Sequence, residues 1–281
     1  ADVDAVPIVL DTQNVDEIVE TVIRIAPAFG GINLEDFAAP QCFEIERRIK
    51  EALTIPVMHD DQHGTAIVVL AGLINGLKVT GKQMKSIKIV ISGAGAAGTA
   101  IAKLLKLAGA GDVTVLDSKG IIGLWRTDLS EHKKELATFT QHKVAGGLAE
   151  ALTGADVLVG VSGPNLATAD DIRLMNTKAM VFALANPTPE IMPEEAKKGG
   201  AMIIATGRSD YPNQINNSLA FPGIFRGALD SGVRKITDDM KVRAAHAIAA
   251  LVPRPTAERV VPDMFDSRVA KAVACAVAGR R

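Results

Sequence analysis

The segment at residues 93–98 places three glycines directly after a predicted strand. That strand, Lys88–Ser92, is a run of β-branched apolar residues, and an Ala/Leu-rich helix is predicted over residues 99–107. A Gly-X-Gly-X-X-Gly turn between a strand and a helix is typical of dinucleotide sites. Its first glycine permits a tight turn, its second lets the backbone approach a pyrophosphate, and its third lets helix and strand pack closely. The segment therefore predicts a Rossmann-type domain, although a glycine-rich turn without a ligand is the alternative.

An acid at the end of the next predicted strand, Asp117, can accept hydrogen bonds from the adenosine ribose. A carboxylate there repels a 2′-phosphate and favours NAD, but basic residues follow at Lys119, Arg126, Lys133 and Lys134. They could hold the phosphate of NADP or form a solvated helix face, so the choice between NAD and NADP stays open. The predicted cofactor-binding residues in this region are Gly93, Ala94, Gly95, Ala96, Ala97, Gly98, Asp117 and Ser118.

Short β-branched runs alternate with helical patterns along the chain, which predicts an α/β fold with a doubly wound, mostly parallel sheet. Residues 1–80 are predicted as a smaller α/β domain, residues 81–236 as the Rossmann domain, and residues 237–281 as C-terminal helices that pack back on the first domain. The strands predicted after the glycine turn are 113–116, Val157–Gly160, Met180–Ala183 and 202–205. In the first domain we expect strands at 6–10, 30–36 and 55–58, and helices at Val15–Ile25, 42–52 and 65–77.

Composition excludes several classes of function. The 281 residues carry a formal net charge of −1 and only 4% aromatic residues, so nothing favours nucleic acid or an anionic membrane as a partner. The longest apolar run, 67–77, is far short of the ~20 residues that span a bilayer. Cys42 and Cys275 match no metal-ligand spacing and are expected to be free thiols of a cytoplasmic protein.

Two acidic pairs, Glu35-Asp36 and Asp60-Asp61, end predicted strands. Ligands gather outside the carboxyl ends of strands in α/β folds, and converging carboxylates suit Mg²⁺ or Mn²⁺. Helix caps or solvated loops are the alternative. His59 and His63 flank the second pair, and we expect them to pack rather than to bind the metal.

Polar loops follow the later strands at 162–165, 186–189, 206–210 and 213–217. Asparagine side chains in these loops can both donate and accept hydrogen bonds, which suits a nicotinamide amide or a substrate carboxylate. Ordinary turn chemistry is the alternative, and for Asn186, which precedes a proline, both interpretations stay open.

Together the segments GGINLEDFAAP, PVMHDDQHGTA, ISGAGAAGTAIA, LDSKGII, ALANPTPEI, ATGRSDYPNQINNSLAFPGIFRGALD and VPDMFDSRVA resemble bacterial malic enzymes over nearly the whole chain. The resemblance implies oxidative decarboxylation of malate to pyruvate and CO₂ with NAD or NADP and Mg²⁺ or Mn²⁺. It implies that Glu35, Asp36 and Asp61 hold the metal, that Asn186 and Asn217 contact cofactor or substrate, and that Asn216 contacts substrate. It also implies a homodimer.

The chain departs from the family pattern in one respect. Members carry a general-acid tyrosine in a YTPG-like motif and a general-base lysine, both in a region N-terminal to these segments, whereas the single tyrosine here, Tyr211, belongs to SDYPNQ. We therefore expect that the chain begins after that region, or that those residues lie on another chain. Alone, it should bind NAD(P) but turn malate over poorly or not at all. Another metal-assisted 2-hydroxy acid dehydrogenase and a truncated nucleotide-binding module without activity are the alternatives.

Overall fold

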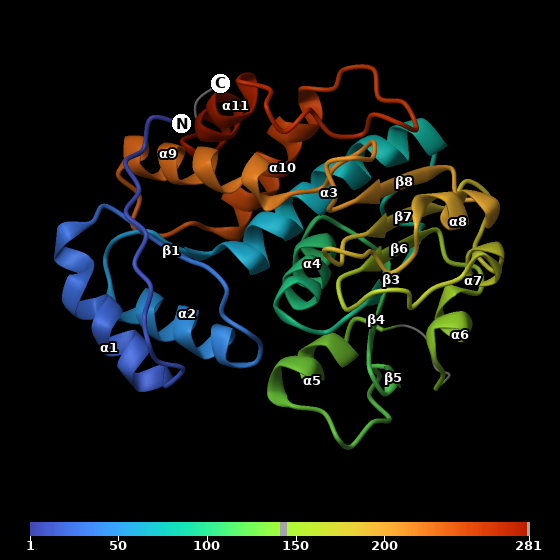
Figure 1. Ribbon diagram of the computed structural model, residues 1–281, viewed down its shortest axis with the longest axis horizontal. Coiled ribbons are helices and arrows are strands. Elements are labelled where there is room, and N and C mark those ends of the chain that lie inside the picture. Colours follow the sequence, from blue (N-terminus) through green and yellow to red (C-terminus); the bar gives the residue numbers. More distant parts are fainter. Residues whose placement is uncertain (141–144, 280–281) are drawn as a thin grey trace.

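The large sheet of the computed structural model, which describes residues 1–140 and 145–279, has six strands in the order β5-β4-β3-β6-β7-β8 (Figure 1). Neighbouring strands are parallel except for the antiparallel pair of β4 and β5. This confirms the predicted α/β fold of the Rossmann type. The strands are β3 (Lys88–Ser92), β4 (Asp112–Asp117), β5 (Gly120–Ile121), β6 (Val157–Gly160), β7 (Met180–Ala183) and β8 (Ile203–Thr206).

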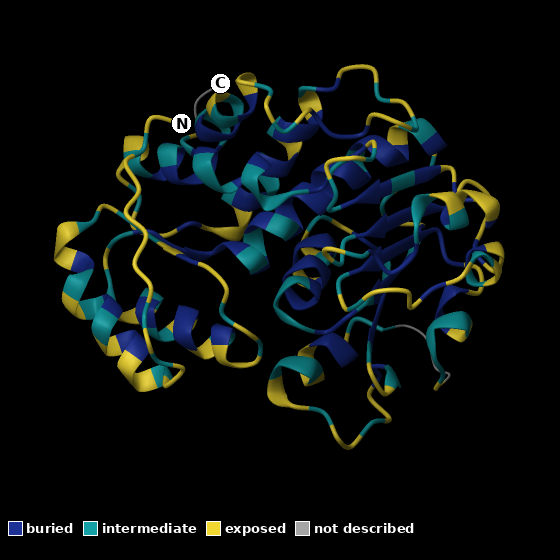
Figure 2. Cartoon of the chain, in the orientation of Figure 1, coloured by how far each residue is buried: buried dark blue, intermediate teal, exposed yellow. Residues whose placement is uncertain are grey.

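Helices cover both faces of this sheet (Figure 1). Ile89 and Ile91 of β3 belong to the core beneath α3 and α4, whereas Val90 belongs to the core beneath α6, α7 and α8. Because successive side chains of a strand point to opposite faces, a continuous apolar strand is buried on both sides. Figure 2 shows these strands as buried. The helices are α3 (Asp60–Thr80), α4 (Ala96–Leu107), α5 (Glu131–Ala137), α6 (Leu148–Leu152), α7 (Ala169–Arg173) and α8 (Pro193–Lys198).

The helix α3 is longer than the predicted 65–77, because it begins at Asp60 immediately after a strand. Asp60 and Asp61 therefore occupy its first turn rather than a loop at a strand end, and the positive end of the helix dipole favours acids there. Among the described residues, α3 is the helix that is long and apolar enough to cross a membrane, but 72% of its apolar window is buried. Such burial is expected of the central helix of an α/β core.

The first part of the chain forms a small parallel sheet of β1 (Ile32–Leu34) and β2 (Val57–His59). The helices α1 (Val15–Ile25) and α2 (Gln41–Ala52) pack together beside it, and a short helix, η1 (Ala26–Ala28), follows α1. Asn14 is the N-cap of α1, since its side chain accepts hydrogen bonds from the backbone N–H groups of Asp16 and Glu17.

The strand predicted over residues 6–10 is wrong. In the structure this segment has no regular hydrogen-bonding partner strand, and the small sheet consists of β1 and β2 within the described residues. Val6, Ile8 and Val9 are exposed, Val9 to 94%. Apolar β-branched composition favours a strand only where a neighbour pairs with it. The strand predicted at 202–205 begins and ends one residue later, as β8.

The C-terminal part is helical, as predicted, with η2 (Asn217–Leu219) and α9 (Phe221–Ser231) before α10 (Asp238–Ala250) and α11 (Arg268–Val277). In the described residues, α3, α4, α10 and α11 contribute to one core. The division at residues 80 and 236 stays a prediction, and residues 280–281 of the third range lie outside the described part.

Asn75 of α3 offers a test of how this core is held. Its buried amide donates to the backbone carbonyls of Ala249 and Val260, both at 2.9 Å. We expect Asn75→Ala to lower the free energy of unfolding by about 2 kcal/mol, because it leaves buried carbonyls without their donor. Urea denaturation measures this, with exposed Gln83→Ala as the control that should change stability by less than about 0.5 kcal/mol. Equal losses of unfolding free energy in the two variants would contradict this role of Asn75.

Candidate active site

The glycine turn has the shape that its sequence predicts. Gly93 has a φ of 122°, and a Cβ on Gly98 would lie 1.8 Å from the Gly93 carbonyl oxygen, so both positions require glycine. A Cβ on Gly95, by contrast, would meet no protein atom within 4 Å. Gly95 is the N-cap of α4, where free N–H groups and the helix dipole attract phosphate. The open space at Gly95 therefore fits a pyrophosphate.

This turn lies at the point where the sheet order reverses direction. It follows β3, which has β4 on one side and β6 on the other. In doubly wound sheets this switch point, at the carboxyl ends of the strands, is where ligands bind. The first helical turn of α4 starts earlier than predicted, at Ala96, so Ala96, Ala97 and Gly98 are helical.

Asp117 ends β4 as predicted, but cations already hold its carboxylate. Arg126 donates to both oxygens, at 2.7 and 3.2 Å, Lys133 donates at 2.7 Å, and the backbone N–H of Lys119 donates at 2.9 Å. Burial would raise the pKa of Asp117, but the hydrogen bonds from Arg126 and Lys133 outweigh it and lower the pKa to about 2. Ser118, the next predicted cofactor residue, is exposed in the turn that follows.

The acids predicted to hold the metal come from two neighbouring elements. Glu35 and Asp36 directly follow β1, and Asp61 lies in the first turn of α3. The backbone N–H of Asp36 donates to the Asp61 carboxylate at 2.8 Å. Asp36 adopts a φ of 59°, an uncommon conformation for a residue other than glycine, which turns the chain after β1. The structure thus places the three predicted ligands on neighbouring segments, with Asp36 joined to Asp61.

Asp60 sits beside these acids and is fully buried. One carboxylate oxygen accepts from the Asn217 amide at 2.8 Å, and the other has no hydrogen-bond partner. Burial and the charges of Glu35 and Asp61 raise the pKa of Asp60 to about 8, and burial followed by the charge of Asp61 raises the pKa of Glu35.

Crowded carboxylates with an unpartnered oxygen fit a divalent cation, whose charge would relieve their repulsion. In residues 1–140 and 145–279, no three His, Cys, Asp or Glu side chains already form a metal cage. The side chains of Glu35, Asp36 and Asp61 would therefore have to converge on an ion. His59 is buried, with Nε2 at 3.1 Å from the Asp61 carboxylate and Nδ1 at 2.9 Å from the Gln62 amide.

The predicted asparagines separate into two places. Asn186 and Asn216 both line a hollow of about 340 Å³ at the carboxyl ends of β7 and β8, together with Arg208 and Gln214. Asn217 instead faces Asp60 and the acids. The loop after β8 therefore reaches both the sheet edge and the predicted metal ligands.

Sequence reasoning missed two buried charged residues near the acids, Glu46 of α2 and Lys241 of α10. A signal was present in each helix. Glu46 lies on the same apolar stripe as Cys42, Ile45 and Ile49, and Lys241 lies on the stripe of Ala244, Ala245 and Ile248. A charge on a stripe that faces the core must find partners there.

Comparison with known proteins agrees with this geometry. Residues 62–280 match the family profile described as malic enzyme, NAD binding domain, and residues 8–50 match malic enzyme, N-terminal domain. The chain belongs to the malic enzyme family. This confirms the resemblance that the sequence motifs carry.

Malic enzymes of several bacteria are similar over almost the whole chain. The bifunctional malic/malolactic enzyme of Bacillus subtilis is 54% identical over 99% of this chain and 69% of its own length. The NAD-dependent malic enzyme of Geobacillus stearothermophilus is 50% identical over 99% of this chain and 58% of its own length. The crystal structure of the NAD-dependent malic enzyme from Thermotoga maritima superimposes with a TM-score of 0.96 at 46% identity, covering 100% of this chain and 75% of that chain. The chain thus spans part of each relative.

Two alanine variants separate the roles of the glycines. We expect Gly95→Ala to leave the thermal midpoint unchanged but to weaken dinucleotide binding at least tenfold, because its methyl group would occupy the open space. Gly98→Ala should lower the thermal midpoint itself, because its Cβ collides with the Gly93 carbonyl. Calorimetric titration and thermal unfolding measure both. Unchanged binding in Gly95→Ala would show that the pyrophosphate lies elsewhere.

Proposed function

We propose that the chain carries the metal and cofactor machinery for the oxidative decarboxylation of (S)-malate to pyruvate and CO₂, with reduction of NAD(P)⁺. The observation that carries the proposal is the 2.8 Å hydrogen bond from the Asn217 amide to Asp60. It joins the loop after β8, at the carboxyl edge of the cofactor sheet, to the helical turn that holds Asp61. The acids therefore lie beside the edge where the nicotinamide and substrate of an α/β dehydrogenase meet.

Glu35, Asp36 and Asp61 would hold the Mg²⁺ or Mn²⁺. A cation there supplies a Lewis acid for the carboxylate and hydroxyl oxygens of a 2-hydroxy acid and for the electrons left behind when CO₂ departs. The chain's own groups bind and orient. Asn186 and Asn216 line the hollow at the sheet edge, and an amide NH₂ there could donate to a nicotinamide amide or a substrate carboxylate. Asn217 orients Asp60 and with it the first turn of α3.

The products decide between this function and its alternatives. With (S)-malate, NADP⁺ and Mn²⁺, we expect pyruvate and reduced cofactor in equal amounts even where turnover is slow, and we expect Asp61→Asn to reduce the rate at least tenfold. Spectrophotometry at the nicotinamide absorbance and a pyruvate assay measure both quantities. Accumulation of oxaloacetate without pyruvate would indicate a simple 2-hydroxy acid dehydrogenase. Cofactor binding without any product would indicate a nucleotide-binding module.

We also propose that the preferred cofactor is NADP. The Asp117 carboxylate accepts four hydrogen bonds, and three of them come from Arg126 and Lys133. The ribose hydroxyls of NAD would therefore have to compete with charged donors for this carboxylate. Lys119 and Arg126 also form ion pairs with Asp128. With Lys133, three side-chain cations therefore surround the two carboxylates of Asp117 and Asp128. A 2′-phosphate carries the negative charge that this excess of one positive charge would attract.

Two adjacent lysines test the cofactor proposal. We expect Lys133→Gln to weaken binding of 2′,5′-ADP roughly tenfold while changing ADP binding less than twofold, because a charged hydrogen bond is lost only with the phosphate. Lys134→Gln makes the same charge change on the same helix, but Lys134 is exposed and pairs with Glu131, so neither ligand should respond. Tighter binding of ADP than of 2′,5′-ADP to the parent chain would contradict the proposal.

We also propose a homodimer, on the basis of the family resemblance, and a cytoplasmic location, on the basis of the two free cysteines.

A further inference from the structure

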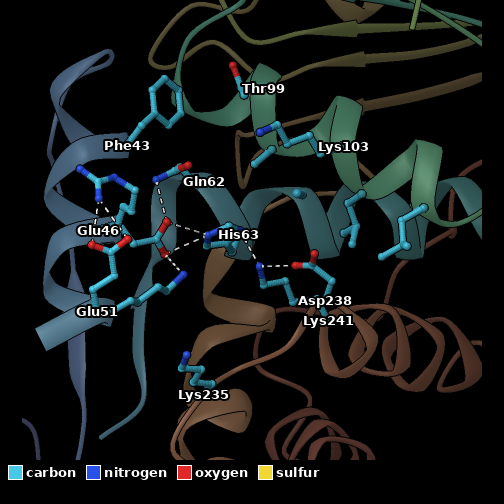
Figure 3. Close-up of a pocket in the computed structure, with 16 residues that line it drawn as sticks. Phe43, Glu46, Glu51, Gln62, His63, Thr99, Lys103, Lys235, Asp238 and Lys241 are labelled. Atoms are coloured by element: carbon cyan, nitrogen blue, oxygen red, sulfur yellow. Dashed lines mark hydrogen bonds and ion pairs between the residues drawn. The ribbon is translucent and has the colours of Figure 1, made fainter. Parts of the chain in front are cut away.

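The carboxylate of Glu46 is the acceptor at the centre of a buried polar network (Figure 3). The residue is 7% exposed and lies on α2. Its oxygens accept hydrogen bonds from the Lys50 ammonium at 2.6 Å, from His63 Nε2 at 2.9 and 3.1 Å, and from the Gln62 amide at 3.3 Å. They also accept from the backbone N–H of His59 at 3.0 Å. One side chain of α2 thus binds several groups at the start of α3.

The network continues through His63 to α10. The Lys241 ammonium lies 3.1 Å from His63 Nδ1 and donates to Asp238 at 2.8 Å. An ammonium can only donate, so Nδ1 must accept and Nε2 must carry the hydrogen that goes to Glu46. The hydrogen bonds therefore run in one direction, from Lys241 through His63 to Glu46.

Glu46 itself stays ionised. Burial would raise the pKa of its carboxyl, but the hydrogen bond from His63 and the charge of Lys50 outweigh burial and hold that pKa well below its usual range. A buried carboxylate with a full set of donors is strongly constrained in position, because each donor would lose a partner if it moved.

The network ends beside the acids predicted to bind the metal. His59 is the last residue of β2, and Asp60 and Asp61 follow it directly. Gln62 and His63, which bind Glu46, and Asp60, which Asn217 holds, all belong to the first turn of α3. The turn that carries Asp61 is therefore held by two other elements, through Glu46 of α2 and through Asn217 of η2.

We propose that Glu46 is a positioning residue for the divalent-cation site. Its hydrogen bonds fix the start of α3 so that Asp61 faces Glu35 and Asp36. The inference rests on the proposed function, because it assumes that these acids bind the metal. Groups that orient metal ligands without touching the ion typically change metal affinity about 10–100-fold when they are removed. Glu46 does not touch the glycine turn, so cofactor binding should not depend on it.

Glu46→Gln keeps the size of the side chain but places an amide donor among the donors that surround it. We expect the Kd for Mn²⁺, measured by electron paramagnetic resonance of the full chain, to rise about 10–100-fold. The Kd for 2′,5′-ADP should stay within about twofold of the parent value. Glu51→Gln is the matched control, because Glu51 lies on the same helix and forms an exposed pair with Arg47. Neither affinity should change in that variant.

The outcomes are distinct. If the parent chain binds no Mn²⁺, the metal site of the proposed function fails. If the parent and Glu46→Gln bind Mn²⁺ equally, the metal site stands and the positioning role is overturned. Loss of both Mn²⁺ and 2′,5′-ADP from a folded Glu46→Gln chain would also overturn it, because Glu46 would then support the structure generally.

Lys241→Met carries the test if circular dichroism shows that Glu46→Gln does not fold. It removes the donor that fixes the His63 ring and leaves Glu46 in place. We expect a several-fold rise in the Kd for Mn²⁺ with 2′,5′-ADP binding unchanged, and an unchanged Mn²⁺ affinity would overturn the proposal.

Discussion

Burial of α3 is the constraint on which the rest of the structure depends. The helix is apolar on nearly every side, so it can be stable only with the sheet, α4 and α10 packed around it. Its first turn, however, carries Asp60 and Asp61, whose buried or partly buried carboxylates need hydrogen-bond donors, water or a cation around them. Because the same helix follows β2 of the small sheet and packs against β7 and β8 of the large one, burying it places the acids where the two sheets meet (Figure 1).

Two groups of carboxylates in the molecule differ in the sign of the charges that surround them. Asp117 receives hydrogen bonds from Arg126 and Lys133, and its pKa falls. Glu35 and Asp60 lie among like charges, and their pKa values rise. A cation stabilises the second group far more than the first, while an anion is attracted only to the first. Charge alone would therefore direct a metal ion and an anionic phosphate to different places.

Periodicity was sufficient for most of the fold. The strands β6 and β7 and the helix α1 were all predicted at their observed bounds, because each is specified by residues that are close in sequence. The errors have physical causes. Residues 6–10 have strand composition but no pairing partner, and an aspartate after a strand is equally suited to a loop or to the first turn of a helix. The partners of Asp117 could not be predicted, since Lys133 reaches it from a separate helix.

Some charged residues lie on the apolar stripes of helices and are buried. Their partners can be found in the sequence only when two helices are considered together. On α2 alone, Glu46 interrupts a stripe, and on α10 alone, Lys241 does the same. Neither is stable in a core without a partner, and an arrangement that leaves one of them unpaired would cost more than it gains from the surrounding apolar contacts. His63 lies between them and can accept from one while donating to the other. Packing α2 and α10 so that both reach His63 of α3 satisfies both charges, and it ties the two helices to the turn that carries Asp61.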